Sequence, residues 1–598
     1  MDLIEKKLDS FLVTTALEKT WPEGSPILFL GEWCRLYHRK DRWQSLDNQL
    51  LPFHWDDRDK LNFDFDYLQK FNEELLDDLG TILNDIHGTE HNSKYWKILI
   101  GFWVNTYTTV LYDRWYSIKE ATKQGGLSTI VLPLDSESLA ANDTSHFCDL
   151  AGSNNYWNHM IYLLCLSDDE RLKRVQNNDS ECIANFKNSV LRHPPTLTEK
   201  VKNFISNGLW LFKRKNRVVI FNSYLSLRDK VVLNASFGQL PSLVDSLGKV
   251  EDIEYLAHFR AWRLSGRAGQ DSFKKFARQV VPLLMPRIFL EGYKVAQSNS
   301  VRSMLPRNPK VIFTSISQYV DDSFKFWTGN QVNNGTKLFI GEHGGFAASR
   351  FSGSMSYDFS IADKYLSTGW DSKSEPVVCP VGNFRVPFRK KAFNISPDGP
   401  VLVTCGSMTQ YVSDIRSMAL GPQTIQNYGH VFDLVDLMTQ DQKKQLRIRL
   451  HPSDQGWDQK ARWLERHPSI QFAEASKSIH KSMSSFRLLI VTYRATVYID
   501  SLMANIPTVM FWDPNLWEVS DCAASIFARL CDAGIFHSSP GSAATHIQKH
   551  WNNIPGWWDS EEVQEARLAF LSAYSGSHLS ALKNIKTEIK RAKQCPST

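Results

Sequence analysis

Short apolar runs that end in glycine or polar residues alternate along the chain with longer stretches of helical spacing. Apolar runs bounded by turn residues are typical of buried strands, and apolar residues at helical spacing are typical of helices packed on a core. The predicted strands lie at 26–30, 127–132, 217–221, 311–315, 337–341, 400–405, 446–450, 470–472, 486–491 and 507–512. The predicted helices lie at 60–90, 95–118, 155–205, 250–300, 321–328, 427–443 and 560–593. Strands that alternate with helices predict an α/β fold with parallel, doubly wound sheets.

The run at 446–450 alternates like a buried strand, and His451 and Pro452 follow it at once. Proline lacks the N–H that a strand ladder needs, so the strand is predicted to stop there, with Arg449 and His451 at its carboxyl edge. Ligands of open α/β sheets bind at that edge. Arg449, His451 and Pro452 are therefore predicted to form an anion site for a nucleotide phosphate.

The same half of the chain carries further candidates for donor binding. Gly406 and Ser407 follow its first strand and could hydrogen-bond a phosphate or a sugar. Thr492 and Thr496 open a predicted helix, and the N-terminus of a helix favours an anion. Asp500, one turn into that helix, is predicted to accept hydrogen bonds from a ribose.

A second polar cluster follows the predicted strand at 337–341. Glu342 and His343 come first, and either could be the base that takes a proton from an acceptor. Gly344 and Gly345 come next, and because glycine lets the backbone approach a ligand closely, they are predicted to form a backbone-amide loop.

Sugar transfer from a nucleotide donor requires stabilisation of the leaving group, removal of a proton from the acceptor hydroxyl and exclusion of water. Arg449 and His451 are predicted to meet the first requirement, and His343, Glu342 or Asp358 the second. A single histidine is more often a structural group than a catalytic one. The shared position of these residues at predicted strand ends favours a glycosyltransferase with its active site between two domains.

Composition narrows the classes of partner. The chain has 598 residues, a formal net charge of +5 and no dense basic tract, so no nucleic-acid partner is expected. The predicted helical region 250–300 is basic, which is typical of a solvated helix face. The minor alternative is a surface that binds a partner or a lipid headgroup. Its cationic residues are Arg260, Arg263, Arg267, Lys274, Lys275 and Arg278.

The cysteine and hydropathy patterns predict a reducing compartment. The 9 cysteines show no CxxC pairing, which argues for free thiols. The N-terminus lacks a signal-peptide core, and no stretch approaches the roughly 20 apolar residues of a membrane helix. We expect a cytoplasmic protein with at most peripheral contact with the inner membrane.

No DxD motif or ligand cluster lies near the predicted strand ends, so no metal is expected, and no cofactor beyond the nucleotide-sugar donor as substrate. His54, Asp56 and Asp57 share one polar loop and could ligate a metal, although their spacing matches no known type of site.

Composition and element order divide the chain into four parts. We predict an N-terminal α/β extension at 1–199, a Rossmann-like acceptor-side domain at 200–385, a Rossmann-like donor domain at 396–545, and C-terminal helices at 546–598 that pack back. A stretch rich in proline, glycine and basic residues at 371–399 is predicted to be the linker between the two Rossmann-like domains.

Several short motifs spread over nearly the whole chain resemble a family of bacterial transferases found in surface-polysaccharide (O-antigen) loci. They are Phe29-Leu30-Gly31-Glu32-Trp33-Cys34, His54-Trp55-Asp56-Asp57-Arg58, His343-Gly344-Gly345, Thr368-Gly369-Trp370 and Asn505-Ile506-Pro507-Thr508. This resemblance implies a glycan or lipid-linked glycan as acceptor.

At a greater distance, Arg449-x-His451-Pro452 looks like the His-Pro motif of bacterial polysialyltransferases and capsule Kdo transferases, where it contacts the phosphate of a CMP-sugar. That resemblance implies a GT-B fold and a CMP-linked donor of Kdo or a nonulosonic acid. Those relatives carry paired acids before the glycine where this chain has Glu342 and His343, so both the base and the anomeric outcome stay open. Ala495 likewise interrupts their paired Ser/Thr pattern before Thr496.

Two alternatives share parts of this pattern. CDP-glycerol phosphotransferases also carry a His-Gly and an Arg-x-His-Pro pattern, and they would transfer glycerol phosphate in place of a sugar. A catalytically inactive carbohydrate- or nucleotide-binding assembly protein would keep the fold, but it would not need His343, Arg449 and His451.

Overall fold

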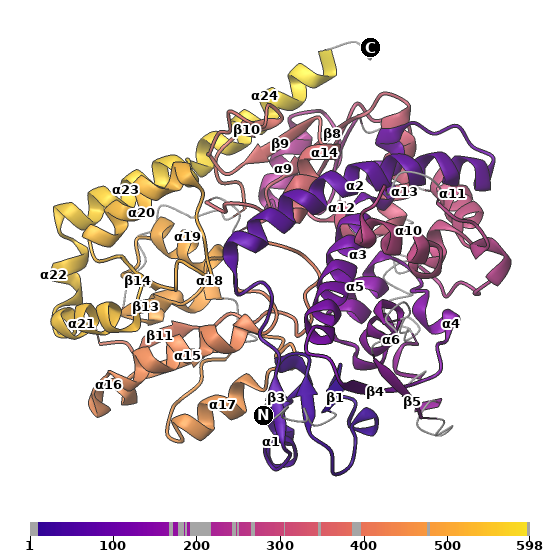
Figure 1. The fold of residues 1–598 in the computed structure, drawn as a ribbon. Helices are drawn as coiled ribbons and strands as arrows, with labels where there is room; N and C mark the ends of the chain where they lie inside the picture. The colour runs from indigo at the N-terminus through magenta and orange to yellow at the C-terminus, as the bar shows by residue number, and fades with distance from the viewer. Residues whose placement is uncertain are drawn as a thin grey trace.

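The computed structural model describes residues 10–166, 172–177, 184–185, 188–191, 217–241, 247, 250–264, 269–303, 305–344, 348–385, 396, 398–474 and 479–594. Three five-stranded sheets follow one another along this part of the chain, and every pairing between their strands is parallel. In Figure 1 the first sheet lies at the bottom, the third on the left and the second at the top.

The first sheet has the strand order β3-β2-β1-β4-β5. Its strands are β1 (Ser10–Val13), β2 (Ile27–Phe29), β3 (Asn48–Leu50), β4 (Leu127–Val131) and β5 (Lys173–Gln176). Its helices are α1 (Lys40–Gln44), α2 (Arg58–His87), α3 (Ser93–Thr122), α4 (Ser136–Leu139), α5 (Thr144–Ser153) and α6 (Asn155–Cys165). The order reverses between β1 and β4, where such sheets bind ligands. Here the indoles of Trp21 and Trp33 donate to the carbonyls of Thr15 and Thr14 and cover the end of β1.

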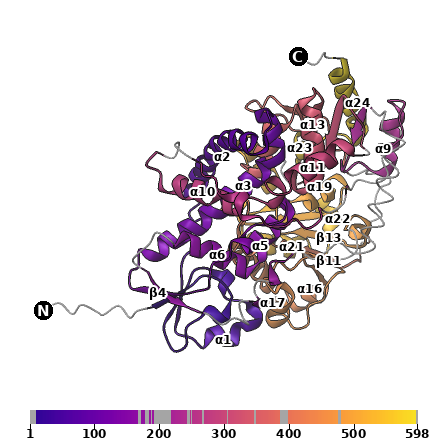
Figure 2. The same ribbon diagram turned by 90° about the vertical axis from the view of Figure 1, so that its right-hand side faces the viewer.

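The hairpin of α2 and α3 joins the first sheet to the second. Asp57 begins α2 by accepting from the Lys60 amide, Gly88 ends it with φ +65°, and Asn92 begins α3 by accepting from the Tyr95 amide. Helix α3 packs against α13 and α14 of the second sheet and against α6 of the first. One continuous hydrophobic core therefore runs through both sheets. Figure 2 shows α2 and α3 from the side, with α6 and β4 below them.

The second sheet has the order β10-β9-β8-β7-β6 and no reversal. Its strands are β6 (Val218–Ile220), β7 (Val311–Thr314), β8 (Lys337–Gly341), β9 (Lys364–Ser367) and β10 (Val378–Pro380). Its helices are α9 (Leu227–Ala235), α10 (Ser272–Leu284), α11 (Tyr293–Arg302), α12 (Ser317–Val320), α13 (Asp322–Asn333) and α14 (Gly353–Ile361).

The third sheet has the order β12-β11-β13-β14-β15, which reverses between β11 and β13. Its strands are β11 (Val401–Thr404), β12 (Leu446–Arg449), β13 (Leu488–Val491), β14 (Thr508–Phe511) and β15 (Phe536–His537). Its helices are α15 (Gln423–Asp436), α16 (Gln440–Lys444), α17 (Gln459–Arg466), α18 (Ile479–Ser482), α19 (Thr496–Met503), α20 (Asp521–Asp532), α21 (Pro540–His550), α22 (Ile554–Trp558) and α23 (Glu561–Tyr574).

The last helix, α24 (His578–Gln594), leaves the third sheet and returns to the second. Ala581, Ile585 and Ile589 pack with β7 and α9 in a separate core on the outer face of the second sheet. Among the described helices, none is both long and apolar enough to cross a membrane.

Several sequence predictions were wrong in detail. The predicted strand at 470–472 is reduced to a single bridge between Phe472 and Ile448. The predicted linker at 371–399 contains β10, an edge strand of three residues that ends in Pro380 and is too short to show a periodic pattern. The predicted helix at 155–205 ends at Cys165, and β5 follows it. The helical prediction for 250–300 holds only from Ser272 onward, apart from one short 3₁₀ turn.

Arg58, at the start of α2, connects the first part of the chain to the third. Its guanidinium contacts both carboxylate oxygens of Glu518 at 2.6 and 2.7 Å and donates to Gln423 at 3.1 Å. Both partners of the ion pair are largely buried, so Arg58→Met is expected to leave Glu518 uncompensated and to lower the free energy of unfolding by about 3 kcal/mol. Urea unfolding measures this change. Lys123→Ala, at an exposed pair with Glu120, is the control and should change stability by less than about 1 kcal/mol.

Candidate functional site

The reversal point of the third sheet brings together the residues predicted to bind the donor. Gly406 and Ser407 follow β11 there, and Thr492 follows β13. A Cβ on Gly406 would lie 3.0 Å from the ring of Tyr493, so only glycine fits without a shift. Ser407 donates to the Asp454 carbonyl at 3.1 Å. The Thr492 hydroxyl donates to the carbonyl of Thr404 at 2.7 Å, so in this structure it holds two strands together, and its part in donor binding stays a prediction.

Arg449 ends the neighbouring edge strand, β12, and His451 follows it by two residues. The Arg449 guanidinium donates to the carbonyl of Glu474 at 2.8 Å, and partial burial lowers its pKa. The imidazole Nδ1 of His451 lies 2.7 Å from the carbonyl of Ser453, and Pro452 between them is exposed. The amide N–H of Ser453 also lies 3.2 Å from Nδ1. When Nδ1 accepts from that amide, the proton of the neutral ring is on Nε2, which can then donate to a phosphate.

The second and third sheets meet where Gly344 approaches α19. A Cβ on Gly344 would lie 2.3 Å from the methyl carbon of Thr496 and 2.2 Å from Nη1 of Arg385. Arg385 faces Asp500, with Nη2 3.8 Å from the carboxylate. The two predicted halves of the site thus contact each other through Gly344, Thr496, Arg385 and Asp500. Gly345 lies outside the described residues.

Glu342 is buried and accepts three hydrogen bonds through one carboxylate oxygen. The donors are the amide of Thr368 at 2.8 Å, its hydroxyl at 2.9 Å and the indole N–H of Trp370 at 2.8 Å. The amide and hydroxyl of Thr368 and the indole of Trp370 thus hold this carboxylate oxygen in place. In this structure Glu342 therefore ties the end of β8 to the loop after β9, and which of Glu342 and His343 is the base stays a prediction.

His343 belongs to a hydrogen-bonded chain with Tyr319 and Asp358. Its Nδ1 lies 3.2 Å from the Tyr319 hydroxyl, which donates to Asp358 at 2.5 Å. Gln318 donates to the other oxygen of Asp358 at 2.9 Å. The Tyr319 hydroxyl has one proton and uses it in the hydrogen bond to Asp358. Its oxygen can therefore only accept from Nδ1–H of His343, which leaves the lone pair of the imidazole on Nε2.

Burial and charge set the protonation of this chain. Burial, with the positive charges of Arg416 and Arg385, lowers the pKa of His343 to about 3, so the imidazole is neutral at pH 7. Burial raises the pKa of Asp358 to about 7, against the opposing effect of its bonds to Tyr319 and Gln318. When Asp358 is protonated, the chain can run in reverse, with Tyr319 donating to Nδ1 and the proton of His343 on Nε2. The chain therefore has two arrangements near neutral pH.

Sequence reasoning missed Tyr319, Arg385, Arg416 and Gln318. Tyr319 and Gln318 lie in α12, directly after β7 and its turn, so their position beyond a strand end was a usable signal. Arg385 follows β10, which was assigned to a linker. Arg416 lies in the long loop after β11, where its backbone forms an isolated antiparallel β-bridge with Ser352. Its side-chain Nε donates to Asp414 at 2.7 Å. Only tertiary packing places these arginines beside His343.

The loop at 54–58, considered as a metal site, has structural contacts. His54 lies 3.0 Å from Asp113, Asp56 accepts from Gln423, and Asp57 caps α2. In the part of the chain that the structure describes, no group of three or more histidine, cysteine or acidic residues is placed to hold a metal.

Gly344 offers a direct test of the contact between the halves. Gly344→Ala is expected to lower the free energy of unfolding by about 2–4 kcal/mol, because the methyl group would meet Arg385 and Thr496 and the backbone φ is +50°. Thermal unfolding measures the loss. Gly238→Ala has φ +69° but no atom within 4 Å of the new methyl group, so it should show only the smaller backbone effect.

Comparison with known families decides the class of the protein. The pattern that defines the LIC12162 family transferases matches residues 10–589. The chain belongs to this family. As a LIC12162 family transferase it carries its conserved pattern across all three sheets, from β1 to α24. No curated protein matches it.

Solved structures similar to this LIC12162 family transferase are distant from it. The spinosyn rhamnosyltransferase SpnG, complexed with spinosyn aglycone, covers 49% of this chain and 79% of its own at 12% identity and a TM-score of 0.27. The S. aureus MnaA–UDP structure covers 64% and 99% at 11% identity and a TM-score of 0.33. WaaG, a glycosyltransferase involved in lipopolysaccharide biosynthesis, covers 62% and 99% at 10% identity and a TM-score of 0.28.

The topology itself confirms the predicted fold class. The second and third sheets are parallel, their carboxyl ends meet at Gly344 and Thr496, and α24 returns from one to the other. This is an α/β fold of GT-B type with an N-terminal α/β extension.

Proposed function

We propose that this transferase is a glycosyltransferase that moves Kdo or a nonulosonic acid from a CMP-linked donor to a surface-polysaccharide or lipopolysaccharide acceptor. The observation that carries the proposal is the pair of arginines beside His343. In CMP-Kdo and CMP-nonulosonic acids the anomeric carbon bears a carboxylate, so a base at that carbon works next to a negative charge. Arg385 and Arg416 both place positive charge near His343.

Arg385 is suited to such a carboxylate. Its side chain is only 7% exposed, and its Nε–H is buried without a hydrogen-bond partner among the described residues. A buried unpaired donor is costly, and an anion that accepts from it recovers that cost. Arg416 is about one-third exposed and lies nearby, with Asp414 and Ser354 as partners. A neutral sugar would leave both charges without an acidic ligand.

In this proposal the CMP moiety binds at the reversal point of the third sheet. Its phosphate would lie between the N-terminus of α19, at Thr496, and the side chains of Arg449 and His451. The Thr496 hydroxyl has no hydrogen bond within the described part of the chain, so it could donate to that phosphate. Asp500 stays a predicted ribose contact, although in this structure it faces Arg385.

In the proposed reaction, Nε2 of His343 takes the proton of the acceptor hydroxyl. The acceptor oxygen forms a bond to the anomeric carbon, the bond from that carbon to the CMP phosphate breaks, and its electron pair stays on the phosphate. Arg449, His451 and the amides of α19 stabilise that charge. Bound anions beside Arg385 and Arg416 would offset the charges that lower the pKa of His343 and make it a stronger base. Direct attack of this kind inverts the anomeric configuration.

Calorimetric titration with CMP, CDP, UDP and GDP tests the donor class. We expect CMP to bind at least about tenfold more tightly than UDP or GDP, because a site built for one phosphate leaves the second phosphate of a diphosphate poorly paired. Preference for UDP or GDP would keep the fold but discard the CMP-sugar, and preference for CDP would favour the glycerol phosphotransferase. Absence of binding to all four nucleotides would favour an inactive assembly protein.

A further inference from the structure

A cavity of about 910 Å³ lies between the segment 260–264 and helix α10. Four cationic residues line it and none of its lining residues is acidic: the cations are Arg260, Arg263, Lys275 and Arg278. None of the residues discussed above for sugar transfer lines this cavity. Four of the six cationic residues singled out in the sequence thus line one cavity, while Lys274 pairs with Glu74 and Arg267 lies outside the described residues.

Arg278 is the central residue of this cavity. Its side chain is 3% exposed, and only Nη1 has an ionic partner, Asp78 at 2.5 Å. Nε and Nη2 are buried and have no hydrogen-bond partner in the part of the chain that the structure describes. Buried donors are almost always satisfied, so two unpaired N–H groups at the wall of a cavity point to an acceptor that binds there.

The charge balance indicates what that acceptor carries. Arg260 is fully paired, with Glu291 and with carbonyl oxygens of α10 and the turn after it, and Arg278 is balanced by Asp78. Arg263 and Lys275 are exposed, and no acidic residue lies within ion-pair distance of either in the described part of the chain. Two positive charges therefore stay uncompensated beside the unpaired donors of Arg278, which matches a doubly charged group.

The rest of the wall is apolar. Trp262, Leu264, Pro282 and Leu283 line the cavity beside the cations. The indole N–H of Trp262 is already bonded to the carbonyl of Phe259 at 3.0 Å, so the ring offers its face. Aromatic faces and aliphatic carbons suit the organic portion of a phosphate ester.

We propose that this cavity is a second binding site, for the phosphate or diphosphate group of an organic phosphate ester. Arg278 donates through Nε and Nη2 to the phosphate oxygens, and Lys275 and Arg263 balance its charge. Trp262 and Leu283 contact the ester group. A soluble phosphorylated sugar and a lipid headgroup share this chemistry.

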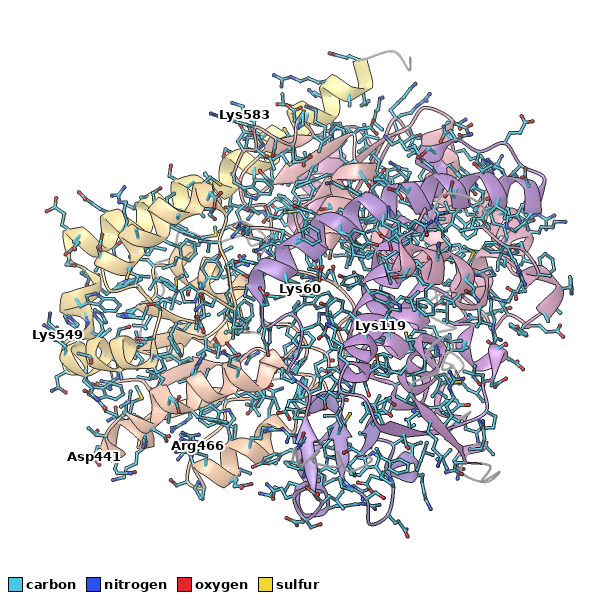
Figure 3. All side chains as sticks on the ribbon, viewed as in Figure 1. Lys60, Lys119, Asp441, Arg466, Lys549 and Lys583 are labelled. Carbon is cyan, nitrogen blue, oxygen red and sulfur yellow. The ribbon has the colours of Figure 1, made fainter. Side chains whose placement is uncertain are left out.

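Titration of the purified full-length protein with inorganic pyrophosphate, followed by calorimetry, tests the site. Lys275→Ala and Arg278→Gln are each expected to weaken binding at least about tenfold, because each removes charge-assisted contacts. Lys549→Ala is the matched control, since Lys549 lies on α21, on the opposite side of the molecule from α10, and it should bind as the wild type does (Figures 1 and 3). Arg449→Ala should likewise keep this binding, which separates the cavity from the donor site.

A second experiment, vesicle binding, distinguishes a lipid headgroup from a soluble phosphate ester as the ligand. Vesicles of phosphatidylglycerol that bind the protein, and that pyrophosphate displaces, would identify a lipid headgroup as the ligand, with phosphatidylcholine vesicles as control. Binding of pyrophosphate without vesicle binding would identify a soluble phosphate ester. Wild-type protein that binds neither, or unchanged binding in both Lys275→Ala and Arg278→Gln, would overturn the proposal. Lys275 is exposed, so its variant is expected to fold even if Arg278→Gln does not.

Discussion

Replacing His343 with alanine is expected to lower kcat by about 10²–10⁴-fold while the Kd for CMP stays within about twofold. A general base takes up the proton in the transition state and makes little contact with the nucleotide. Its loss therefore lowers turnover and leaves donor binding intact. The measurement pairs steady-state release of CMP with calorimetric titration of the same variant. A His343→Ala protein with normal turnover would show that another group is the base.

Tyr319 gives a finer test of the same chain. Tyr319→Phe removes the oxygen that accepts from Nδ1–H of His343 and is expected to lower kcat by about tenfold or more. Tyr357→Phe is the matched control, since the partners of the buried Tyr357 hydroxyl within the described residues are the carbonyls of Ile98 and Gln318. Equal losses in both variants would indicate a packing effect.

Asp358 links this chain to pH. Its folded pKa is about 7, and His343 holds its lone pair on Nε2 only when Asp358 is ionised, so kcat is expected to rise as pH increases through about 7. Asp358→Asn cannot titrate and should flatten that rise. Stability moves in the opposite direction. The folded state keeps a proton that the unfolded state loses between pH 3.8 and about 7, so the contribution of Asp358 to stability falls as pH rises through that window.

Replacing Arg449 or His451 with alanine is expected to abolish measurable transfer, with the fold intact. Both side chains lie at the carboxyl end of β12, where each would meet the donor phosphate, and each charge-assisted contact contributes about 1.5–3 kcal/mol. We therefore expect CMP affinity to fall about 10–100-fold in each variant, with a further loss in kcat because the leaving phosphate gains charge in the transition state.

Arg447→Ala is the control for this pair. Arg447 lies on the same strand but donates to the carbonyls of Lys444 and Leu446, at the opposite end from the predicted phosphate site. Its loss should leave CMP binding unchanged. Normal turnover in Arg449→Ala or His451→Ala would remove the donor-site assignment.

The sequence was most informative where local pattern decides structure. Strands β7, β8, β11, β12, β13 and β14 appear within one or two residues of their predicted positions, because each is a compact apolar run with a sharp end. The positions of Glu342, His343, Arg449 and His451 at strand ends followed from those runs.

The rest of the site depends on tertiary packing. The hydrogen bond from Tyr319 to Asp358 joins α12 to α14, and no spacing in the sequence sets the distance between those helices. The different contacts of Glu342 and His343 also needed coordinates, since adjacent residues after a strand point in different directions. Arg385 and Arg416 enter from loops whose course depends on how the second and third sheets meet.

Release of CMP from CMP-Kdo and from a CMP-nonulosonic acid is the most direct measurement, with a surface-polysaccharide or lipopolysaccharide extract as acceptor. The account predicts that wild-type protein consumes at least one of these donors, that the sugar appears on the acceptor, and that His451→Ala and His343→Ala do neither. UDP-glucose and CDP-glycerol are run beside them. Consumption of either of those, with both CMP-linked donors untouched, would contradict the account.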